Sequence, residues 1–338
     1  MYTKGKTCFF NKNIIVSGSA GVAGKKEGEG PLGSKFDAVF DDTTMGEDSF
    51  ELAESAMLHD AIVRALANAG KKEEDVDFIM TGDLLDQCVG SCFAIKDLQI
   101  PFVGMYGACS TMALTLCNSA VLVDAGAKCC VAGASSHFCS SERQFRFPLE
   151  YGGQRPPTAQ WTVTGAGSAV VEECQDEKAE QQIKIKAIQI GTITDLGIKD
   201  ANNMGAAMAP AAARTISDFL DDSKMSADDF DMILTGDLGY TGTQLLHEVL
   251  KAEYGKNIKS VHNDCGLMIY NLKEQDVNSG GSGCGCSASV LCSYIFNEMK
   301  SGRLKKILFV ATGALMSPTS SKQGQPIPGI AHAVLLEK

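Results

Sequence analysis

Two segments, DVDFIMTGDL at residues 75–84 and DFDMILTGDL at residues 229–238, decide the fold because they are near copies of each other. Seven of the ten aligned positions are identical, and the segments start 154 residues apart. Each reads as an acidic loop that leads into a short apolar strand ending in Thr-Gly-Asp-Leu. Such a repeat in a chain of 338 residues indicates that one supersecondary unit occurs twice.

The repeat extends beyond these segments. Apolar residues at helical spacing predict a helix before each copy, over residues 52–68 and 206–220. Strands and helices alternate after each copy: we predict strand 100–106, helix 110–125 and strand 129–135, and later helix 243–255, strand 257–262, helix 287–302 and strand 306–314. This alternation predicts an α/β fold with helices covering two mixed, largely parallel sheets. We expect two duplicated βαβαβ halves, 1–180 and 181–338, packed about a pseudo-twofold axis.

The composition excludes some classes of protein. A net charge of −11 argues against a nucleic-acid surface, which needs a basic face. The 13 cysteines occur without a signal-peptide pattern at the N-terminus, so we interpret them as reduced thiols in a cytosolic compartment. No window approaches the ~20 uninterrupted apolar residues of a transmembrane helix. Any membrane association is therefore expected to be peripheral.

The segment GACST, residues 107–111, places Cys109 where a predicted buried strand ends and a long helix begins. The positive end of that helix and its free N–H groups would favour the thiolate over the thiol. Cys109 is therefore a candidate nucleophile or pocket residue. The alternative is a small buried residue that fills a tight turn.

A nucleophilic cysteine needs a base, which is normally histidine. Of the five histidines, His262 is the candidate, because it follows the predicted strand NIKSV in the second half. The repeat offset relates it to the turn that carries Cys109, and a pseudo-twofold axis would bring the two turns together. The alternative is a loop histidine with local hydrogen bonds.

The duplicated halves and the cysteine at a central helix resemble the thiolase and ketosynthase superfamily. The chain is more similar still to the stage V sporulation protein AD family of endospore formers. Matching segments run from about residue 17 to residue 337 and include SAGVAGKKEGEGPLGSKFD, PFVGMYGACST, SSHFCSSERQFRFPLEYGGQRP, HNDCGLMIY and GGSGCGCSAS.

This resemblance implies a thiolase-like fold and a role in moving dipicolinic acid (pyridine-2,6-dicarboxylate) into the developing spore and out of the germinating one. It implies a protein that binds the acid, alone or as its calcium chelate, and works with the other SpoVA channel proteins. It also implies a homodimer on the forespore side, peripherally associated with the spore inner membrane. No nucleic acid and no cofactor is expected.

One loop departs from the pattern of the superfamily's enzymes. Decarboxylating ketosynthases carry an asparagine where residues 283–289 read GCGCSAS, with Cys284 at the corresponding position. Cys284 or Cys286 could act as an acid, as a second cysteine does in degradative thiolases. The same spacing could suggest a metal site, but no second pair of ligands lies nearby, so no metal is expected.

Dipicolinate would need fixed cations and an aromatic or apolar slot. The segment SSERQFRFPLEYGGQR supplies Arg143, Arg146 and Arg155 among aromatic residues. The alternative is that these arginines pair with nearby glutamates or hold a dimer contact. Lys25 and Lys26 are a weaker candidate pair. Asp83, in the first TGDL, is a further pocket candidate, although its duplication as Asp237 favours a structural task.

These residues are compatible with two different functions. In the first, the protein binds dipicolinate without chemistry, and Cys109 and His262 line an old thiolase pocket. In the second, it is a thiolase- or ketosynthase-type acyltransferase in which Cys109 forms a thioester, His262 is the base and Cys284 or Cys286 the acid. The missing asparagine favours binding, so we expect a non-catalytic or degenerate thiolase-like protein.

Overall fold

The computed structural model describes residues 1–146, 155–174 and 182–338, and it contains two halves with the same strand order. The sheet of the first half runs β6-β5-β7-β9-β3, and that of the second half runs β12-β11-β14-β15-β10. The strands of the first half are β3 (Ile14–Gly24), β5 (Phe78–Gly82), β6 (Phe102–Gly104), β7 (Cys129–Ser136) and β9 (Gly165–Glu173). Those of the second are β10 (Ile183–Gln189), β11 (Met232–Thr235), β12 (His262–Asp264), β14 (Lys306–Ala314) and β15 (Gly329–Glu337).

Both sheets are mixed in the same way. β5 pairs in parallel with β6 and β7, and β11 pairs in parallel with β12 and β14. The other two pairings of each half are antiparallel. A short antiparallel pairing of β3 with β10 joins the two sheets edge to edge. The predicted α/β fold class is confirmed.

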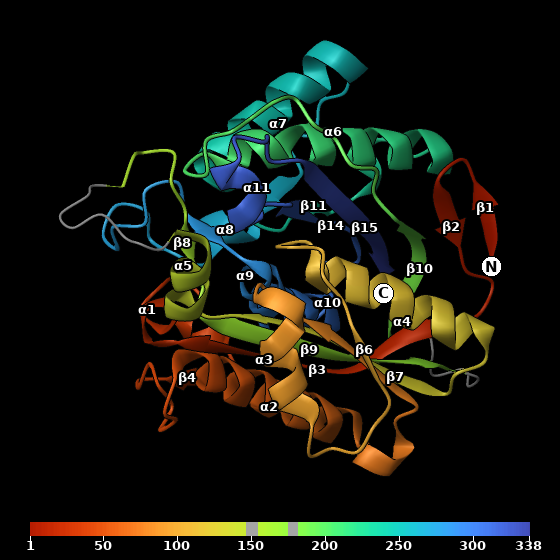
Figure 1. Cartoon of the computed structure of the whole chain (residues 1–338). Helices are drawn as coiled ribbons and strands as arrows, with labels where there is room; N and C mark the ends of the chain where they lie inside the picture. Colours follow the sequence, from red (N-terminus) through yellow and green to blue (C-terminus); the bar gives the residue numbers. More distant parts are fainter. Residues whose placement is uncertain (147–154, 175–181) are drawn as a thin grey trace.

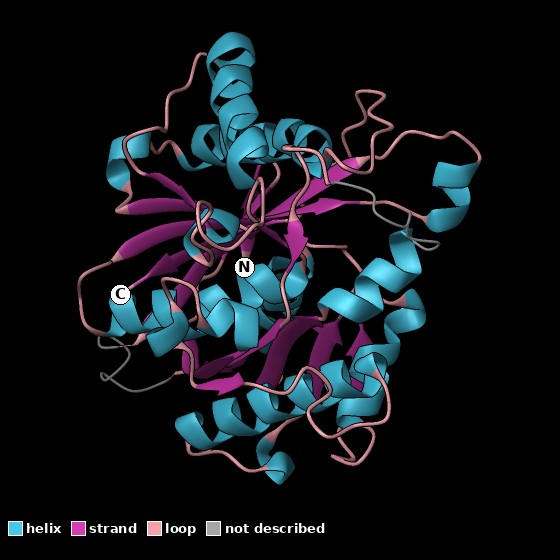
Figure 2. Cartoon of the chain, turned by 90° about the vertical axis from the view of Figure 1, so that its left-hand side faces the viewer, coloured by secondary structure: helices cyan, strands magenta, loops and turns pink. Residues whose placement is uncertain are grey.

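Helices and sheets alternate in five layers (Figures 1 and 2). The helices α2 and α3 cover the outer face of the first sheet, and α6 and α7 cover the outer face of the second. The layer between the sheets holds α4, α9, a π-helical turn and α10. These helices are α2 (Phe50–Ala69), α3 (Val89–Ile95), α4 (Thr111–Ala125), α6 (Met204–Ser223), α7 (Gly239–Tyr254), α9 (Cys284–Ser289), the π turn (Val290–Ile295) and α10 (Phe296–Lys300).

Short elements complete the chain. The strands are β1 (Tyr2–Lys4), β2 (Thr7–Phe9), β4 (Ala38–Phe40), β8 (Trp161–Thr162) and β13 (Gly281–Ser282). The helices are α1 (Lys25–Gly28), α5 (Phe138–Arg146), α8 (Cys265–Met268) and α11 (Pro318–Lys322). β8 pairs in parallel with β13, outside the main sheet.

The predicted repeat is present at the level of single elements. α2 and α6 each have 20 residues and lie 154 positions apart, as do their following 3₁₀ turns, Glu73–Asp75 and Ala227–Asp229. The predicted central helix 110–125 is α4. The expected boundary between the halves, at residue 180, lies outside the described residues.

Among the described residues, one segment is long and apolar enough to cross a membrane, Ala108–Ala125, with a mean hydropathy of 1.3. Two thirds of it, 67%, is buried in the structure. It contains α4, which lies between the two sheets (Figure 1). Its apolar composition is that of a helix buried on all sides.

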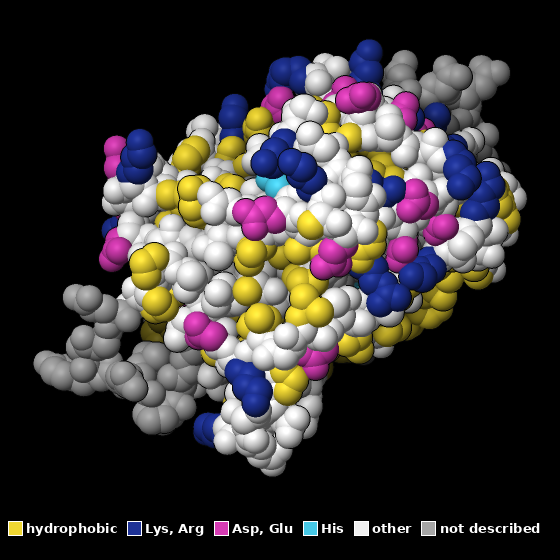
Figure 3. Space-filling model, turned by 90° about the horizontal axis from the view of Figure 1, so that it is seen from above, with side chains coloured by type: hydrophobic (Ala, Val, Ile, Leu, Met, Phe, Trp, Pro, Cys, Tyr) yellow, Lys and Arg dark blue, Asp and Glu magenta, His cyan; other side chains and the backbone are white. Residues whose placement is uncertain are grey.

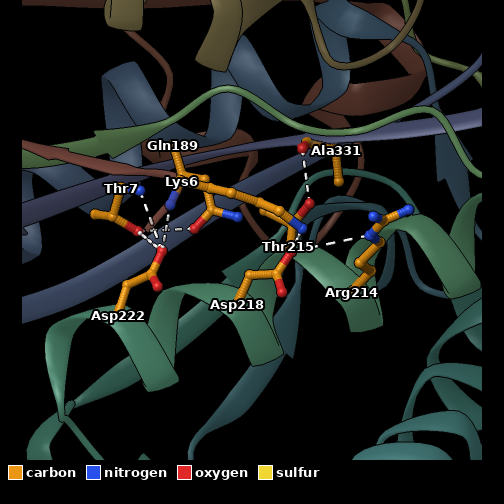
Figure 4. Close-up of polar contacts among 8 residues, drawn as sticks. All are labelled: Lys6, Thr7, Gln189, Arg214, Thr215, Asp218, Asp222 and Ala331. Atoms are coloured by element: carbon orange, nitrogen blue, oxygen red, sulfur yellow. Dashed lines mark hydrogen bonds and ion pairs between the residues drawn. The ribbon is translucent and has the colours of Figure 1, made fainter. Parts of the chain in front are cut away.

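The N-terminal hairpin β1–β2 is held on α6 by two carboxylates (Figure 4): Asp218 forms an ion pair with Lys6 Nζ at 2.7 Å, and Asp222 binds the backbone. Asp222 accepts hydrogen bonds from the backbone N–H groups of Lys6 and Thr7, at 2.8 and 3.1 Å. The Thr7 hydroxyl lies 3.0 Å from both Asp222 Oδ2 and Gln189 Oε1. Gly5, with φ +54°, brings the backbone so close to Asp222 that a Cβ at this position would overlap the carboxylate.

Replacing Asp222 with alanine is expected to lower the free energy of unfolding by about 1–3 kcal/mol, because two N–H groups lose their acceptor. The matched control is Asp221→Ala, which removes only the exposed ion pair with Lys256 and should cost about 0–1 kcal/mol. Denaturant titration of both variants measures the difference. Equal losses would contradict the role assigned to Asp222.

Candidate functional site

Cys109 lies in a tight turn between the end of β6 and the start of α4. Ala108 has φ +49°, a left-handed conformation that is strained for a residue with a Cβ. Side-chain hydrogen bonds close the turn: Ser110 Oγ donates to the Gly107 carbonyl at 2.6 Å, and Thr111 Oγ1 donates to the Ala108 carbonyl at 2.7 Å. The turn therefore holds the Cys109 side chain in one place.

The second half packs directly on this turn. Gly313 of β14 lies so close that a Cβ there would meet the Gly107 carbonyl oxygen. The Asp237 side chain, which follows β11, reaches the Cys109 thiol and hydrogen-bonds with it. Cys109 thus lies at the contact between the two halves.

A pocket opens at Cys109. It encloses about 420 Å³ of empty space, including its mouth. A shallower hollow continues it outwards and shares Tyr106, Phe145 and Met316 with it. The pocket is lined by Leu84, Tyr106, Ala108, Cys109, Ser141, Glu142, Phe145, Thr162, Met204, Ser282, Ala314 and Met316. None of these described residues is a lysine, arginine or histidine.

The Cys109 thiol is a poor nucleophile in this setting. Burial is the largest cause that raises its pKa far above the ordinary value, and the charge of Asp237 and their hydrogen bond add to it. The Gly283 and Ala314 backbones act in the opposite direction but do not compensate. The prediction that the junction favours the thiolate is therefore wrong, because desolvation and a buried carboxylate outweigh the helix end.

Asp237 is held in place by three hydrogen bonds. It hydrogen-bonds with Cys109, and it accepts from Thr312 Oγ1 at 2.7 Å and from the Gly283 N–H at 2.9 Å. Burial raises its pKa to about 7, against the effect of these bonds. The Cys109 proton has little tendency to move to Asp237, because the thiol pKa stays above that of the carboxyl.

His262 is not in the turn where the sequence offset placed it. It starts β12 and pairs with Ile233 of β11. The residue of β5 that corresponds to Ile233 is Ile79, and Ile79 pairs with Phe102 of β6. His262 thus corresponds to Phe102, at the opposite end of the strand from Cys109. The expected strand 257–262 is also wrong, since β12 is His262–Asp264. The cause is the connection before β12, in which α7 is much longer than its equivalent α3.

The ring of His262 has partners of its own. It lies 2.9 Å from Thr235 Oγ1 and 3.0 Å from the ring of His247. Burial lowers its pKa to about 3, so the imidazole is neutral. No hydrogen bond joins it to Cys109 within the described chain. Its role as base or ligand group stays a prediction.

The other predicted site residues in the core are not among the residues that line the pocket. Cys284 is fully buried and its thiol donates to the Ser135 carbonyl at 2.8 Å. The Cys286 thiol donates to the Gly236 carbonyl at 3.6 Å. Asp83 accepts from the Leu85 and Ser91 N–H groups, at 2.9 and 2.7 Å. Asp83 thus orders the loop after β5, the structural task that its duplication favoured.

The predicted cations lie in different places. Arg143 forms an ion pair with Glu51 of α2 and is half exposed. The side chain of Arg146 lies outside the described residues. Arg155 and Lys26 both lie over the ring of Trp161, with the Arg155 guanidinium carbon 4.8 Å and Lys26 Nζ 4.3 Å from its centroid. The structure therefore brings together two cations that the sequence analysis considered separately.

Sequence reasoning missed three features of the Cys109 pocket. Asp237 was expected to have only a structural task, because the TGDL segment is duplicated. Glu142, which accepts a hydrogen bond from Thr162 Oγ1 at 3.2 Å, was seen only as a partner for arginine. Ser141 lines the pocket with a hydroxyl that has no hydrogen-bond partner among the described residues. With 3.6 residues per turn, a helix over this segment would place Ser141, Glu142 and Phe145 on one face, and this periodicity could have indicated them.

Comparison with solved structures defines the class of fold. The chain matches 3-oxoacyl-[acyl-carrier-protein] synthase III from Aquifex aeolicus with a TM-score of 0.58 at 13% identity, covering 96% of this chain and 100% of that one. It matches human mitochondrial 3-ketoacyl-CoA thiolase, solved with CoA, with a TM-score of 0.57 at 11% identity, covering 97% and 98%. Cerulenin-bound Xanthomonas campestris OleA gives 0.60 at 13% identity, covering 99% and 100%. The fold is thiolase-like.

Comparison of sequences defines the family. The profile of stage V sporulation protein AD matches residues 4–337. Stage V sporulation protein AD of Bacillus subtilis (strain 168) is 44% identical over 334 residues, which cover 98% of this chain and 97% of that protein. The chain belongs to the stage V sporulation protein AD family and is a sporulation protein with a thiolase-like fold.

Alkylation of Cys109 is expected to be slow at pH 8, where the thiol is protonated and Asp237 is mostly ionised. Asp237→Asn removes the negative charge, so the thiol pKa falls and the alkylation rate rises by about tenfold, one pKa unit. Peptide mass spectrometry after iodoacetamide treatment measures this, with exposed Cys92 as internal reference. Fast labelling of the unmodified protein would refute the argument.

Proposed function

We propose that the protein binds dipicolinic acid without transforming it, and presents it to the SpoVA channel proteins during sporulation and germination. The proposal rests on the protonation state of the Cys109 thiol. Its thiol is held protonated by burial and by Asp237, and within the described chain it has no hydrogen bond to a histidine. A thiolase-like fold of this family thus retains a pocket at Cys109 but lacks an activated nucleophile.

The second candidate is acyl transfer through a Cys109 thioester. It is supported by the cysteine itself and by the backbone of Gly283 and Ala314 close to the sulfur, which could face a developing oxyanion. Against it stand the raised thiol pKa and the positions of Cys284 and Cys286, whose thiols are turned to backbone carbonyls. Binding is therefore the better supported function.

The cellular setting is part of the proposal. We place the protein on the forespore side, peripherally associated with the spore inner membrane. The face over α6 and α7 carries lysine, arginine and acidic side chains intermixed with apolar ones (Figure 3). A mixed surface of this kind offers no broad basic face for anionic lipid. We propose that contacts with the channel proteins hold it there.

A homodimer is also proposed. β6 is the terminal strand of its sheet, and Val103 on it and Phe93 on the neighbouring α3 are 41% and 47% exposed. Terminal strands with apolar side chains readily pair with a second chain. A solution-scattering mass of one chain would contradict this assembly.

Isothermal titration calorimetry of the purified protein is expected to show saturable binding of dipicolinate, with and without equimolar calcium. Benzoate, which has one carboxylate, is the control and should bind at least about tenfold more weakly, since it loses one charge-assisted contact. Acyl-CoA compounds should be neither hydrolysed nor condensed. Absence of dipicolinate binding, or turnover of an acyl-CoA that Cys109→Ala abolishes, would reject the proposed function.

A further inference from the structure

Four side chains of the second half form a continuous chain of hydrogen bonds that ends at a buried carboxyl group. His262 and Asp264 are two residues apart on β12, so their side chains lie on the same face of the strand. Thr235 of β11 pairs with Asp264 in the parallel register, and α7 contributes His247. His247 Nε2 lies 3.0 Å from His262 Nδ1, and His262 Nε2 lies 2.9 Å from Thr235 Oγ1. Thr235 Oγ1 lies 2.7 Å from Asp264 Oδ2.

The partners determine which atom donates at each step. The Thr235 hydroxyl donates its single proton to the Asp264 carboxylate, so Thr235 Oγ1 accepts from His262 Nε2–H. A neutral His262 ring that carries its proton on Nε2 accepts at Nδ1, and the donor there is His247 Nε2–H. All the protons of the chain therefore point towards Asp264.

The same four groups are equally well hydrogen-bonded in the opposite direction. A proton from solvent binds His247 Nδ1, which has no hydrogen-bond partner among the described residues, and the His247 Nε2 proton passes to His262 Nδ1. The His262 Nε2 proton passes to Thr235 Oγ1, and the Thr235 hydroxyl proton passes to Asp264 Oδ2. One solvent proton is taken up, Asp264 becomes neutral, and both rings stay neutral with their proton on Nδ1.

The carboxyl group is the place where the proton stays. Burial raises the pKa of Asp264 to about 6. Burial lowers the pKa of His262 to about 3, and the neighbouring His247 ring contributes to this. Burial also lowers the pKa of His247, and the charge of Lys259 lowers it further. Near pH 6, a proton that enters the chain therefore resides on Asp264 and not on His262.

Three other titratable groups face Asp264 from the elements packed around it. Asp237 lies in the loop after β11, Cys265 is in α8 and Cys286 is in α9. Burial raises the pKa of both thiols far above the ordinary value, so they carry no charge near pH 6. Within the described surroundings of Asp264, Asp237 is thus the group that shares its titration range.

The first half shows that the fold does not require this chain. The positions equivalent to His262 and Asp264 are occupied there by Phe102 and Gly104. The threonine of the first TGDL segment, Thr81, is buried, and its hydroxyl has no hydrogen-bond partner among the described residues. The two histidines and the carboxyl group are therefore a feature of the second half alone, added to a strand pair that the first half builds without them.

The end of the chain lies directly behind the Cys109 pocket. Asp264 accepts hydrogen bonds from the N–H groups of Leu238 and Gly239, at 2.9 and 3.0 Å. These residues follow Asp237, which hydrogen-bonds with Cys109. Burial is the main cause of the raised pKa of Asp237, and the charge of Asp264 adds to it. Neutral Asp264 therefore favours the ionised form of Asp237.

We propose that His247, His262, Thr235 and Asp264 form a proton relay through which the pH of the solvent sets the charge of Asp264. The relay is a pH-sensitive switch: Asp264 is charged above about pH 6 and neutral below it, and Asp237 beside Cys109 responds to the change. This inference does not depend on which molecule the Cys109 pocket binds.

Nuclear magnetic resonance of the full chain with ¹⁵N-labelled histidine tests the relay. At about pH 8, His262 is expected to be neutral with its proton on Nε2. At about pH 5, it is expected to be still neutral but with its proton on Nδ1, and the midpoint of the change should lie near pH 6. Infrared spectroscopy should show a protonated carboxyl band that appears with the same midpoint and is missing in Asp264→Asn.

One internal reference and two variants separate a relay from simple burial. His332 is also buried, but its Nδ1 accepts from the backbone N–H of Gly191 at 3.0 Å, a donor that cannot reverse, so its proton should stay on Nε2 throughout. Thr235→Val interrupts the chain, so the change at His262 should be lost while the carboxyl band of Asp264 remains. Thr235→Ser keeps the hydroxyl and should restore the change. Thermal unfolding shows whether each variant is folded.

The first measurement is decisive on the unmodified protein. A His262 ring that keeps its proton on Nε2 down to about pH 5, or that becomes a cation as the carboxyl band appears, would overturn the relay. A change at His262 that survives in folded Thr235→Val would also overturn it. A change that shares its midpoint with the carboxyl band, is lost with valine and returns with serine would support it. Calorimetric binding of dipicolinate tests the proposed function separately from all of these outcomes.

Discussion

The close approach of the two halves at Gly107 and Gly313 is the constraint on which the site depends. Because Gly313 has no Cβ, β14 can lie against the carbonyl of Gly107, and this contact holds the Cys109 turn against the second half. It brings Asp237 of one half to the thiol of the other. The duplicated fold thus determines the chemistry of Cys109: the same packing that buries the thiol also gives it a carboxylate partner, and both raise its pKa.

Much of the fold was predictable because the repeat is strong where the elements are regular. The helices before each TGDL segment, the strands that carry it and the central helix were found from apolar periodicity, since these elements bury one or both faces. Connections were not predictable in the same way. α3 and α7 join equivalent strands but differ in length, so a fixed offset of 154 residues misplaced His262 by six positions. Loop length is a property that sequence periodicity does not report.

The candidate site was predicted only in part, for a related reason. Cys109 was found because its position at a strand–helix junction is visible locally. Asp237 and the Trp161 cluster were not found, because their contacts join segments far apart in the chain. The sequence analysis noted Lys25 and Lys26 as a charged pair and Arg155 as part of an arginine-rich segment. Nothing in the sequence indicates that Lys26 and Arg155 lie over the same ring, that of Trp161. Tertiary packing decides such contacts.

The Cys109 pocket and the cavity beside Trp161 share a wall formed by α5 and β8. Along β8, successive side chains point to opposite sides: Trp161 lines one cavity and Thr162 lines the other. In the same way, α5 contributes Phe138 to the Trp161 cavity, and Ser141, Glu142 and Phe145 to the Cys109 pocket. The hydrogen bond from Thr162 to Glu142 fastens α5 to β8. Because α5 and β8 contribute to both linings, a substitution that shifts the backbone of either element changes the shape of both cavities.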